Sequence, residues 1–341
     1  MHILLLFLTL LPVSLPAQQF LAGWKYSQAL HIQPQQNLTD FQVSFDINTL
    51  ALIEGGKMHP TGQDIRVTDS DGKTFLCYWL EGNVYDSLVK LWVKVPVLRA
   101  QEEKVIYLHY GNPQAEKIAD GACTFLLFDD FEGDALNQQV WDWYGGGTLE
   151  IRNSQAHISA TGQDLMLRSV QSFNLPIIVE MKVDASEGKY TALALLKDSD
   201  IFRQGYALSH NQIRESMQLT RTDAEASPCG GFSFLPFALE AVKAKQHTGI
   251  WSLAWITRHH IFATWDTGSL IEENSFWTIE NLKVALGALA CKMNSETQTA
   301  KLVVDWVRIR RFAQQPPQVL LGYEESDPSI GVLDFRGSYM G

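Results

Sequence analysis

The sequence predicts an all-β protein built from two antiparallel β-sandwich domains. Short segments with apolar residues at every second position recur along the chain, and turn residues separate them at short intervals. Few segments show the 3.6-residue spacing of apolar residues that is typical of helices. At 341 residues the chain is long enough to bury two cores. Because each sheet must bury one face against another, many short strands favour stacked antiparallel sheets.

The clearest strands lie in residues 64–113, which contain DIRVTDSDGKTFLCYWLE, LWVKVP and IYLHYGNP. Apolar side chains occupy alternate positions there, at Val67, Phe75, Cys77 and Trp79. The pair Asp71-Gly72 is typical of a tight hairpin turn. This stretch is therefore predicted to form a β-meander, a pattern that indicates sheet structure and no chemistry.

Residues 24–119 resemble a bacterial domain of unknown function that is found fused to MotA/TolQ/ExbB-type proton channels. The resemblance runs from GWKYSQALHI through DFQV, the DIR and D-G-K motifs and LWVKVP to YGNP. It implies an architecture and a cell-envelope location, and no activity. This chain lacks the channel helices, so the implied partner is a separate TolQ/ExbB-like channel complex, for which the protein would be a scaffold or sensor.

Residues 125–312 resemble concanavalin A-like, laminin-G-like lectin/glucanase domains. The opening is TFLLFDDFEGDALNQQVWDWYGGG and the closing strand is KLVVDWVRIRRF, in which successive side chains point to opposite faces. The resemblance implies that the second domain is a concanavalin A-like jelly roll. The expected organisation is a signal peptide at 1–17, a β-sandwich at 18–120, the jelly roll at 121–315 and a flexible C-terminal tail at 316–341.

The N-terminus has the features of a signal peptide. Residues 3–11 form an apolar run, followed by Pro12, Pro16 and the small residue Ala17, after which cleavage is expected. The run is shorter than the ~20 residues that span a bilayer. We therefore expect export to the periplasm, cell surface or medium and no transmembrane segment in the mature chain; a retained, membrane-anchoring or buried N-terminal segment is the alternative.

The C-terminal residues hold few large apolar groups, which favours flexibility. An alternative is that GVLDF, at residues 331–335, adds as an edge strand to this protein or to a partner.

The net charge of -11 and the pI near 5.3 argue against a nucleic-acid-binding surface. Four cysteines permit three disulfide pairings in an oxidising compartment. We expect Cys77, in mid-strand, to be a buried free thiol, and Cys229 with Cys291 to be the favoured disulfide.

Calcium is the one cofactor with physical support, as a structural ion. Asp129 and Asp130 lie near the opening strand, and Asp305 lies on the closing strand, which in such sandwiches tends to pair with the first. Hard carboxylate oxygens are what Ca²⁺ requires. The alternative is that these carboxylates are solvated or cap turns, since alternation sends Asp129 and Asp130 to opposite faces.

Loop aromatics are the candidates for ligand binding. Trp141, Trp143 and Tyr144 lie in an expected loop before three glycines. Aromatic faces can stack on sugar rings, so these residues are predicted to form a glycan platform; packing beneath the loop is the alternative. Four further tryptophans lie in apolar strands and are predicted core residues: Trp251, Trp255, Trp265 and Trp306.

Glycoside hydrolysis would need two carboxylates ~5–10 Å apart, for which E-x-D-x-x-E is the natural spacing on a strand. The nearest match is Glu132-Gly133-Asp134, which lacks the last carboxylate. No catalytic residue is therefore expected. The function expected is non-catalytic binding of carbohydrate or another cell-envelope component, with the envelope scaffold as the alternative and hydrolysis as the third.

Overall fold

The computed structural model describes residues 20–197, 205–222, 237–244, 247–257, 260–266, 268–272, 280–290 and 296–335. The chain divides into two compact units. Unit 1 comprises Met1–Thr39, Val43–Ala119 and Pro317–Gly341. Unit 2 comprises Asp40–Gln42 and Asp120–Pro316. Both are built from antiparallel sheets, so the predicted all-β class is confirmed.

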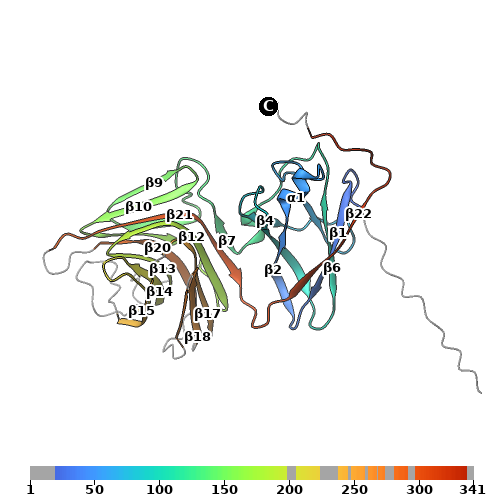
Figure 1. Ribbon diagram of the computed structural model, residues 1–341. Helices are drawn as coiled ribbons and strands as arrows, with labels where there is room; N and C mark the ends of the chain where they lie inside the picture. The colour runs from blue at the N-terminus through green and yellow to red at the C-terminus, as the bar shows by residue number, and fades with distance from the viewer. Residues whose placement is uncertain are drawn as a thin grey trace, which may run out of the picture. The chain divides into compact units, whose positions relative to one another are not determined.

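Unit 1 has a four-stranded sheet in the order β22-β1-β6-β3 and a three-stranded sheet in the order β2-β5-β4 among the described residues (Figure 1). The elements are β1 (Tyr26–Gln33), β2 (Leu38–Ile47), α1 (Thr49–Glu54), β3 (Arg66–Thr68), β4 (Tyr78–Glu81), β5 (Val89–Leu98), β6 (Lys104–Tyr110) and β22 (Gln318–Ser326). Alternation buries one face of each sheet: in β5, Leu91, Val93 and Val95 are fully buried.

The predicted meander is wrong in its connectivity, although its strands and its turn are present. Strand β3 pairs with β6, whereas β4 pairs with β5 in the other sheet, so the chain changes sheet between them. The Asp71 turn forms as expected, because the Asp71 carboxylate accepts hydrogen bonds from the backbone of Lys73 at 2.9 Å and of Thr74 at 2.8 Å.

A buried carboxylate joins the DIR and YGNP motifs. The side chain of Asp64 accepts backbone hydrogen bonds from His59 at 3.0 Å, Gly111 at 2.8 Å and Asn112 at 3.4 Å. Burial raises the pKa of Asp64, and these donors oppose that shift. The motif residues thus fix the backbone of unit 1, in agreement with a structural role.

The C-terminal residues complete unit 1, so the predicted flexible tail is wrong for Gln318–Ser326. These residues form β22, which pairs antiparallel with β1 from Tyr26 opposite Ser326 to Gln33 opposite Gln318. Residues 331–335 form no strand in this chain; instead Lys25 Nζ donates a hydrogen bond to the Gly331 carbonyl at 2.6 Å. Unit 2 is therefore inserted between β6 and β22 of unit 1.

Unit 2 is a sandwich of two large antiparallel sheets (Figure 1). In the described residues, sheet C has the order β19-β18-β17-β12-β21-β10-β9, with β7 also pairing with β21, and sheet D has the order β16-β15-β14-β13-β20-β11-β8. The elements are α2 (Gly121–Thr124), β7 (Leu127–Asp129), β8 (Trp141–Gly145), β9 (Thr148–Arg152), β10 (Gln155–Thr161), β11 (Asp164–Ser169), β12 (Ile177–Gly188), β13 (Tyr190–Lys197), β14 (Gly205–Asn211), β15 (Ser216–Thr222), β16 (Phe237–Lys243), β17 (Gly249–Thr257), β18 (His260–Trp265), β19 (Gly268–Glu272), β20 (Leu282–Leu289) and β21 (Thr299–Arg311).

The core of unit 2 lies between sheets C and D, as expected for the predicted jelly roll. Trp251 and Trp255 are fully buried there, and Trp265 is 5% exposed. The ring of Tyr206, from sheet D, meets that of Trp255, from sheet C, edge-on with 4.9 Å between centroids. The core assignment of these tryptophans is confirmed, and Trp306 is buried too.

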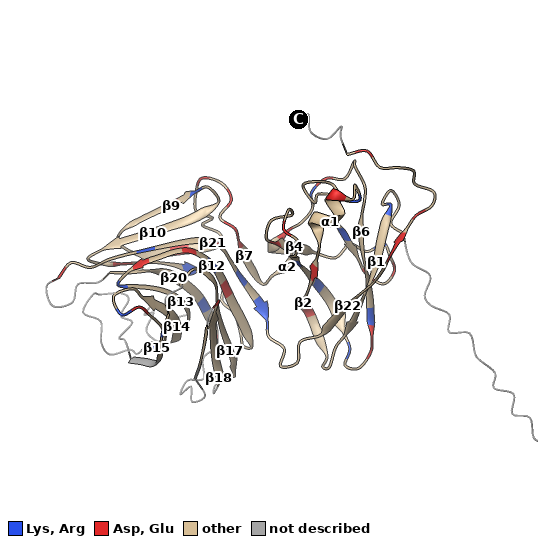
Figure 2. Ribbon diagram, viewed as in Figure 1, with Lys and Arg blue, Asp and Glu red and all other residues tan. Residues whose placement is uncertain are grey.

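The neighbouring strands β12 and β21 carry charged residues of both signs (Figure 2). Glu180 of β12 lies opposite Arg308 of β21, and both are buried. The Glu180 carboxylate accepts hydrogen bonds from Arg308 Nε at 2.6 Å and from Arg310 Nη2 at 2.8 Å. A buried charge is stable only with such partners.

A second buried polar cluster joins β12, β13 and β14. Ser186 Oγ lies 2.7 Å from His210 Nδ1 and 2.5 Å from Thr191 Oγ1. The ring of His247 stacks on that of His210, with 4.0 Å between centroids. Burial, and then the charge of His247, lower the pKa of His210 to about 4.

This cluster predicts a loss of stability in mild acid. Below its ordinary pKa of 6.5, His210 is protonated in the unfolded chain but stays neutral in the folded chain down to about pH 4. Unfolding therefore takes up a proton in this window, and stability should fall by about 1–2 kcal/mol as the pH drops through it, after allowance for solvent screening. Melting temperatures of the wild type and of His210→Gln at pH 7 and at pH 4.5 check this. The melting temperature should fall less between the two pH values in His210→Gln than in the wild type, and an equal fall in both would contradict the prediction.

Candidate functional site

A turn of three glycines connects the two sheets of unit 2 at one edge. It joins β8, the last strand of sheet D, to β9, the last strand of sheet C. Gly145 has φ +94°, and a Cβ there would lie 1.9 Å from the Asp164 carbonyl oxygen. The Gly146 backbone donates a hydrogen bond to that same carbonyl at 2.9 Å. The glycines therefore allow close backbone contact where β8 ends at Gly145.

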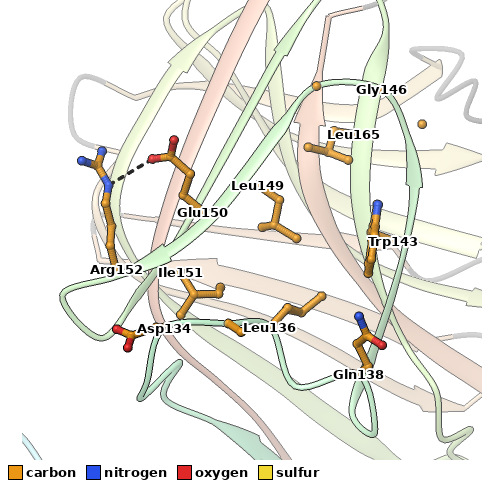
Figure 3. Close-up of a pocket in the computed structure, with 13 residues that line it drawn as sticks. Asp134, Leu136, Gln138, Trp143, Gly146, Leu149, Glu150, Ile151, Arg152 and Leu165 are labelled. Carbon is orange, nitrogen blue, oxygen red and sulfur yellow. Dashed lines mark ion pairs between the residues drawn. The ribbon is translucent and has the colours of Figure 1, made fainter.

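A cavity of about 710 Å³ opens beside this turn, between the two edge strands (Figure 3). Its lining residues come from the loop before β8, from β8 and β9, and from β11: Asp134, Ala135, Leu136, Gln138, Trp143, Gly145, Gly146, Gly147, Leu149, Glu150, Ile151, Arg152 and Leu165. This volume lies within the range of ~300–1,000 Å³ that is usual for small-molecule sites.

The apolar part of the cavity is the open end of the core. Ile151 and Leu165 belong to the core cluster, and Leu136 and Leu149 pack against it. Trp143 supplies an indole that is 49% exposed. The cavity thus combines an apolar wall with one accessible aromatic ring, a combination that ligand sites commonly have.

Polar side chains lie at the rim of the cavity. Asp134 and Gln138 come from the exposed loop before β8, and Glu150 forms an ion pair with Arg152 at 3.4 Å (Figure 3). His157 lies opposite Glu150 on β10, and burial, followed by the charge of Arg152, lowers its pKa. The loop side of the cavity thus offers Asp134 and Gln138 as hydrogen-bonding groups beside an apolar surface.

The three predicted aromatics do not form one platform. Residues 141–145 form a strand and no loop, and successive side chains of a strand point to opposite faces. Trp141 is buried in the core and donates its indole N–H to Asp129 at 2.7 Å. Tyr144 lies on the other face of sheet D, where the Arg168 guanidinium lies 4.5 Å from its ring centroid. Only Trp143 lines the cavity.

The predicted calcium ligands Asp129, Asp130 and Asp305 are not assembled as a site. Each Asp129 oxygen accepts one hydrogen bond, one from the Trp141 indole and one from the Phe131 backbone. Burial raises the pKa of Asp305, and the charges of Asp184 and Asp130 add to this. In the described part of the chain no three acidic, histidine or cysteine side chains come together as metal ligands.

The cavity includes residues that sequence reasoning missed. Glu132 of the Glu-Gly-Asp motif does not line it, whereas Asp134 does, together with Gln138 and the β9 residues Leu149 and Glu150. In the sequence, strand β9 shows only the alternation of apolar and polar residues that many strands share. Its role depends on its position at the edge of sheet C, and no local pattern reports that position.

The cysteine prediction is wrong for Cys77. Cys77 and Cys123 are each disulfide-bonded, and the described chain holds no free cysteine. Cys229 and Cys291 lie outside the described residues.

In the part of the chain that the structure describes, no helix has the length and apolar character that crossing a bilayer requires.

Fold and cavity together define an all-β protein of two sandwich units with a ligand-sized cavity in the second. Residues 61–144 match the family described as Domain of unknown function (DUF2341). The resemblance expected for residues 24–119 is thereby supported in part, and the match carries no link to proton channels. No curated protein matches.

Solved structures similar to this chain include carbohydrate-active enzymes. β-Agarase A in complex with oligoagarose is 11% identical, with 54% of this chain and 90% of that chain covered and a TM-score of 0.40. β-Agarase A from Zobellia galactanivorans is 11% identical, with 57% and 91% covered and a TM-score of 0.41. A glycosyl hydrolase family protein from Mycobacterium fortuitum is 15% identical, with 54% and 99% covered and a TM-score of 0.38.

Proposed function

We propose that the protein is an exported carbohydrate-binding protein that holds a sugar in the cavity of unit 2 without catalysing a reaction. The observation that carries this proposal is the half-exposed indole of Trp143 beside a cavity of about 710 Å³ with a polar rim. The ring can stack on the C–H face of a sugar. Asp134 and Gln138 can then bond the hydroxyl groups of the sugar.

Trp143→Ala is expected to weaken sugar binding at least tenfold, since a central aromatic anchor contributes about 1–2 kcal/mol or more to a binding site. Glycan-array screening of the full chain identifies a ligand, and isothermal titration calorimetry then measures both dissociation constants. Trp143→Phe should retain most of the affinity.

Tyr144→Phe is the matched control, because Tyr144 is the next residue but faces away from the cavity. Equal loss in Tyr144→Phe would contradict the assignment of the cavity. Absence of any sugar binding by the wild type would contradict the function itself, and co-purification with a TolQ/ExbB-like channel complex would then support the scaffold alternative.

Two disulfide-bonded cysteines support the proposed export, because disulfides persist in oxidising compartments outside the cytoplasm. Fractionation of cells that express the chain, with thiol labelling of each fraction, tests this. A reduced, cytoplasmic protein with an intact N-terminus would contradict it.

Hydrolysis has one observation in its favour, since two carboxylates, Asp134 and Glu150, line the same cavity. Glu150, however, is exposed and paired with Arg152, whereas a catalytic acid is usually kept protonated by an apolar environment. Incubation of any bound glycan with wild type, Asp134→Asn and Glu150→Gln separates the functions. Turnover that both substitutions abolish would establish an enzyme.

A further inference from the structure

The interior of the cavity restricts which part of a ligand can enter. Leu149 and Ile151 alternate with Glu150 and Arg152 along β9, so the apolar side chains face the core side while the ion pair lies on the other face (Figure 3). Leu165 of β11 and Leu136 of the loop complete the apolar surface. The charged side chains of β9 thus lie on the opposite face from this apolar surface, Asp134 and Gln138 come from the loop before β8, and the backbone of the three glycines lines the side next to the turn.

This separation makes the surface formed by these four apolar side chains unfavourable for a hydroxyl group. A hydroxyl that loses water without gaining a hydrogen bond costs about 1–3 kcal/mol. A methyl group in the same place gains about 0.8 kcal/mol from burial. An ordinary sugar exposes hydroxyls on nearly every carbon, so it could contact the rim and Trp143 but could not fill the interior.

We infer that the ligand of unit 2 is a sugar bearing a methyl group, which enters between Leu149, Ile151 and Leu165 while the sugar ring lies against Trp143. This inference rests on the proposed function. The methyl group has two chemical sources: C6 of a 6-deoxy sugar, or the acetyl group of an N-acetylated amino sugar. Both place an apolar end beside a ring that carries hydroxyls.

Titration calorimetry of the full chain with matched sugar pairs tests the inference. Methyl fucoside is compared with the galactoside of the same L configuration, which differs by one hydroxyl at C6, and N-acetylglucosamine is compared with glucose. The methyl-bearing member of at least one pair is expected to bind about tenfold or more tightly. The pair that shows the preference identifies the source of the methyl group.

Equal affinity within both pairs would overturn the inference but leave carbohydrate binding intact. Binding of none of these sugars, and of no glycan on an array, would overturn the proposed function and the inference with it. The two failures are thus distinguishable.

Substitutions inside the cavity give an independent readout. Leu149→Asn is expected to reduce the preference for the methyl-bearing sugar at least fivefold, whereas Leu149→Met should keep it, because only the first places a hydrogen-bonding group in the interior. Leu136→Ser, in the loop, serves as a second variant where Leu149→Asn does not fold. Leu320→Asn, on an exposed position of unit 1, controls for the change in polarity. An unchanged preference in folded Leu149→Asn or Leu136→Ser would contradict the placement of the methyl group.

Discussion

Glu180→Gln is expected to lower the free energy of unfolding of unit 2 by about 3–5 kcal/mol, the usual effect of removing one partner of a buried ion pair. The carboxylate is 6% exposed and accepts hydrogen bonds from two arginines, of which Arg308 is 2% exposed. An amide keeps the shape but removes the negative charge. The guanidinium of Arg308 would then remain buried without this counter-charge.

Glu187→Gln is the matched control on the same strand. Glu187 is exposed and lies 3.6 Å from Lys301, and an exposed pair of this kind contributes less than about 1 kcal/mol. Urea denaturation followed by circular dichroism measures both variants. Similar losses in the two would show that burial of the Glu180 network does not stabilise the fold.

The same network sets a pH dependence. Burial acts to raise the pKa of Glu180, but the charges of Arg308 and Arg310 prevail and lower it to about 2, from an ordinary value of 4.5. The stabilisation is therefore complete above pH 4.5 and is lost as the pH falls toward 2. Glu180→Gln should lack this part of the acid sensitivity.

Gly145→Ala is expected to destabilise unit 2 by about 2–6 kcal/mol. Positive φ strains any residue with a Cβ by roughly 1–3 kcal/mol, and forcing an atom into packed structure adds a similar amount. At Gly145 both apply, since φ is +94° and the new Cβ would lie 1.9 Å from the Asp164 carbonyl oxygen. Because this turn borders the cavity, sugar binding should weaken as well.

Gly133→Ala separates the two contributions. Gly133 has a similar φ of +100°, but nothing lies within 4 Å of the position where its Cβ would be. Thermal melting of the two variants should therefore show only the smaller, conformational loss for Gly133→Ala. If Gly133→Ala were as unstable as Gly145→Ala, contact of the new Cβ with the Asp164 carbonyl would not contribute to the loss.

The strands could be predicted from sequence, but their partners could not. Alternation of apolar residues depends on local geometry, which is why the all-β class and the buried Trp251 and Trp255 were predictable. The choice of sheet depends on distant pairing, which is why the change of sheet between β3 and β4 was missed. Strand β22 was missed for a related reason: it is an edge strand without a clear period of two, with both Leu320 and Leu321 exposed.

The candidate site, too, could be predicted only where it depends on local sequence pattern. An aromatic ligand contact near the three glycines was predicted, and Trp143 has the expected exposure. The error was to take residues 141–145 as a loop, because a strand assignment would have placed Trp143 and Tyr144 on opposite faces at once. Calcium binding stays a prediction; the hydrogen bond from the Trp141 indole to Asp129 is a contact that no spacing rule could show.

The insertion of unit 2 within unit 1 has a consequence for biosynthesis. Strand β1 acquires its neighbour β22 only after residues 120–316 have been synthesised, so unit 1 cannot be completed before unit 2 has been made. A stop codon between residues 316 and 318 would leave unit 2 intact but remove β22. Strand β1, near the N-terminus, would then lack this partner. The maturation of the first unit is thereby linked to the synthesis of the second.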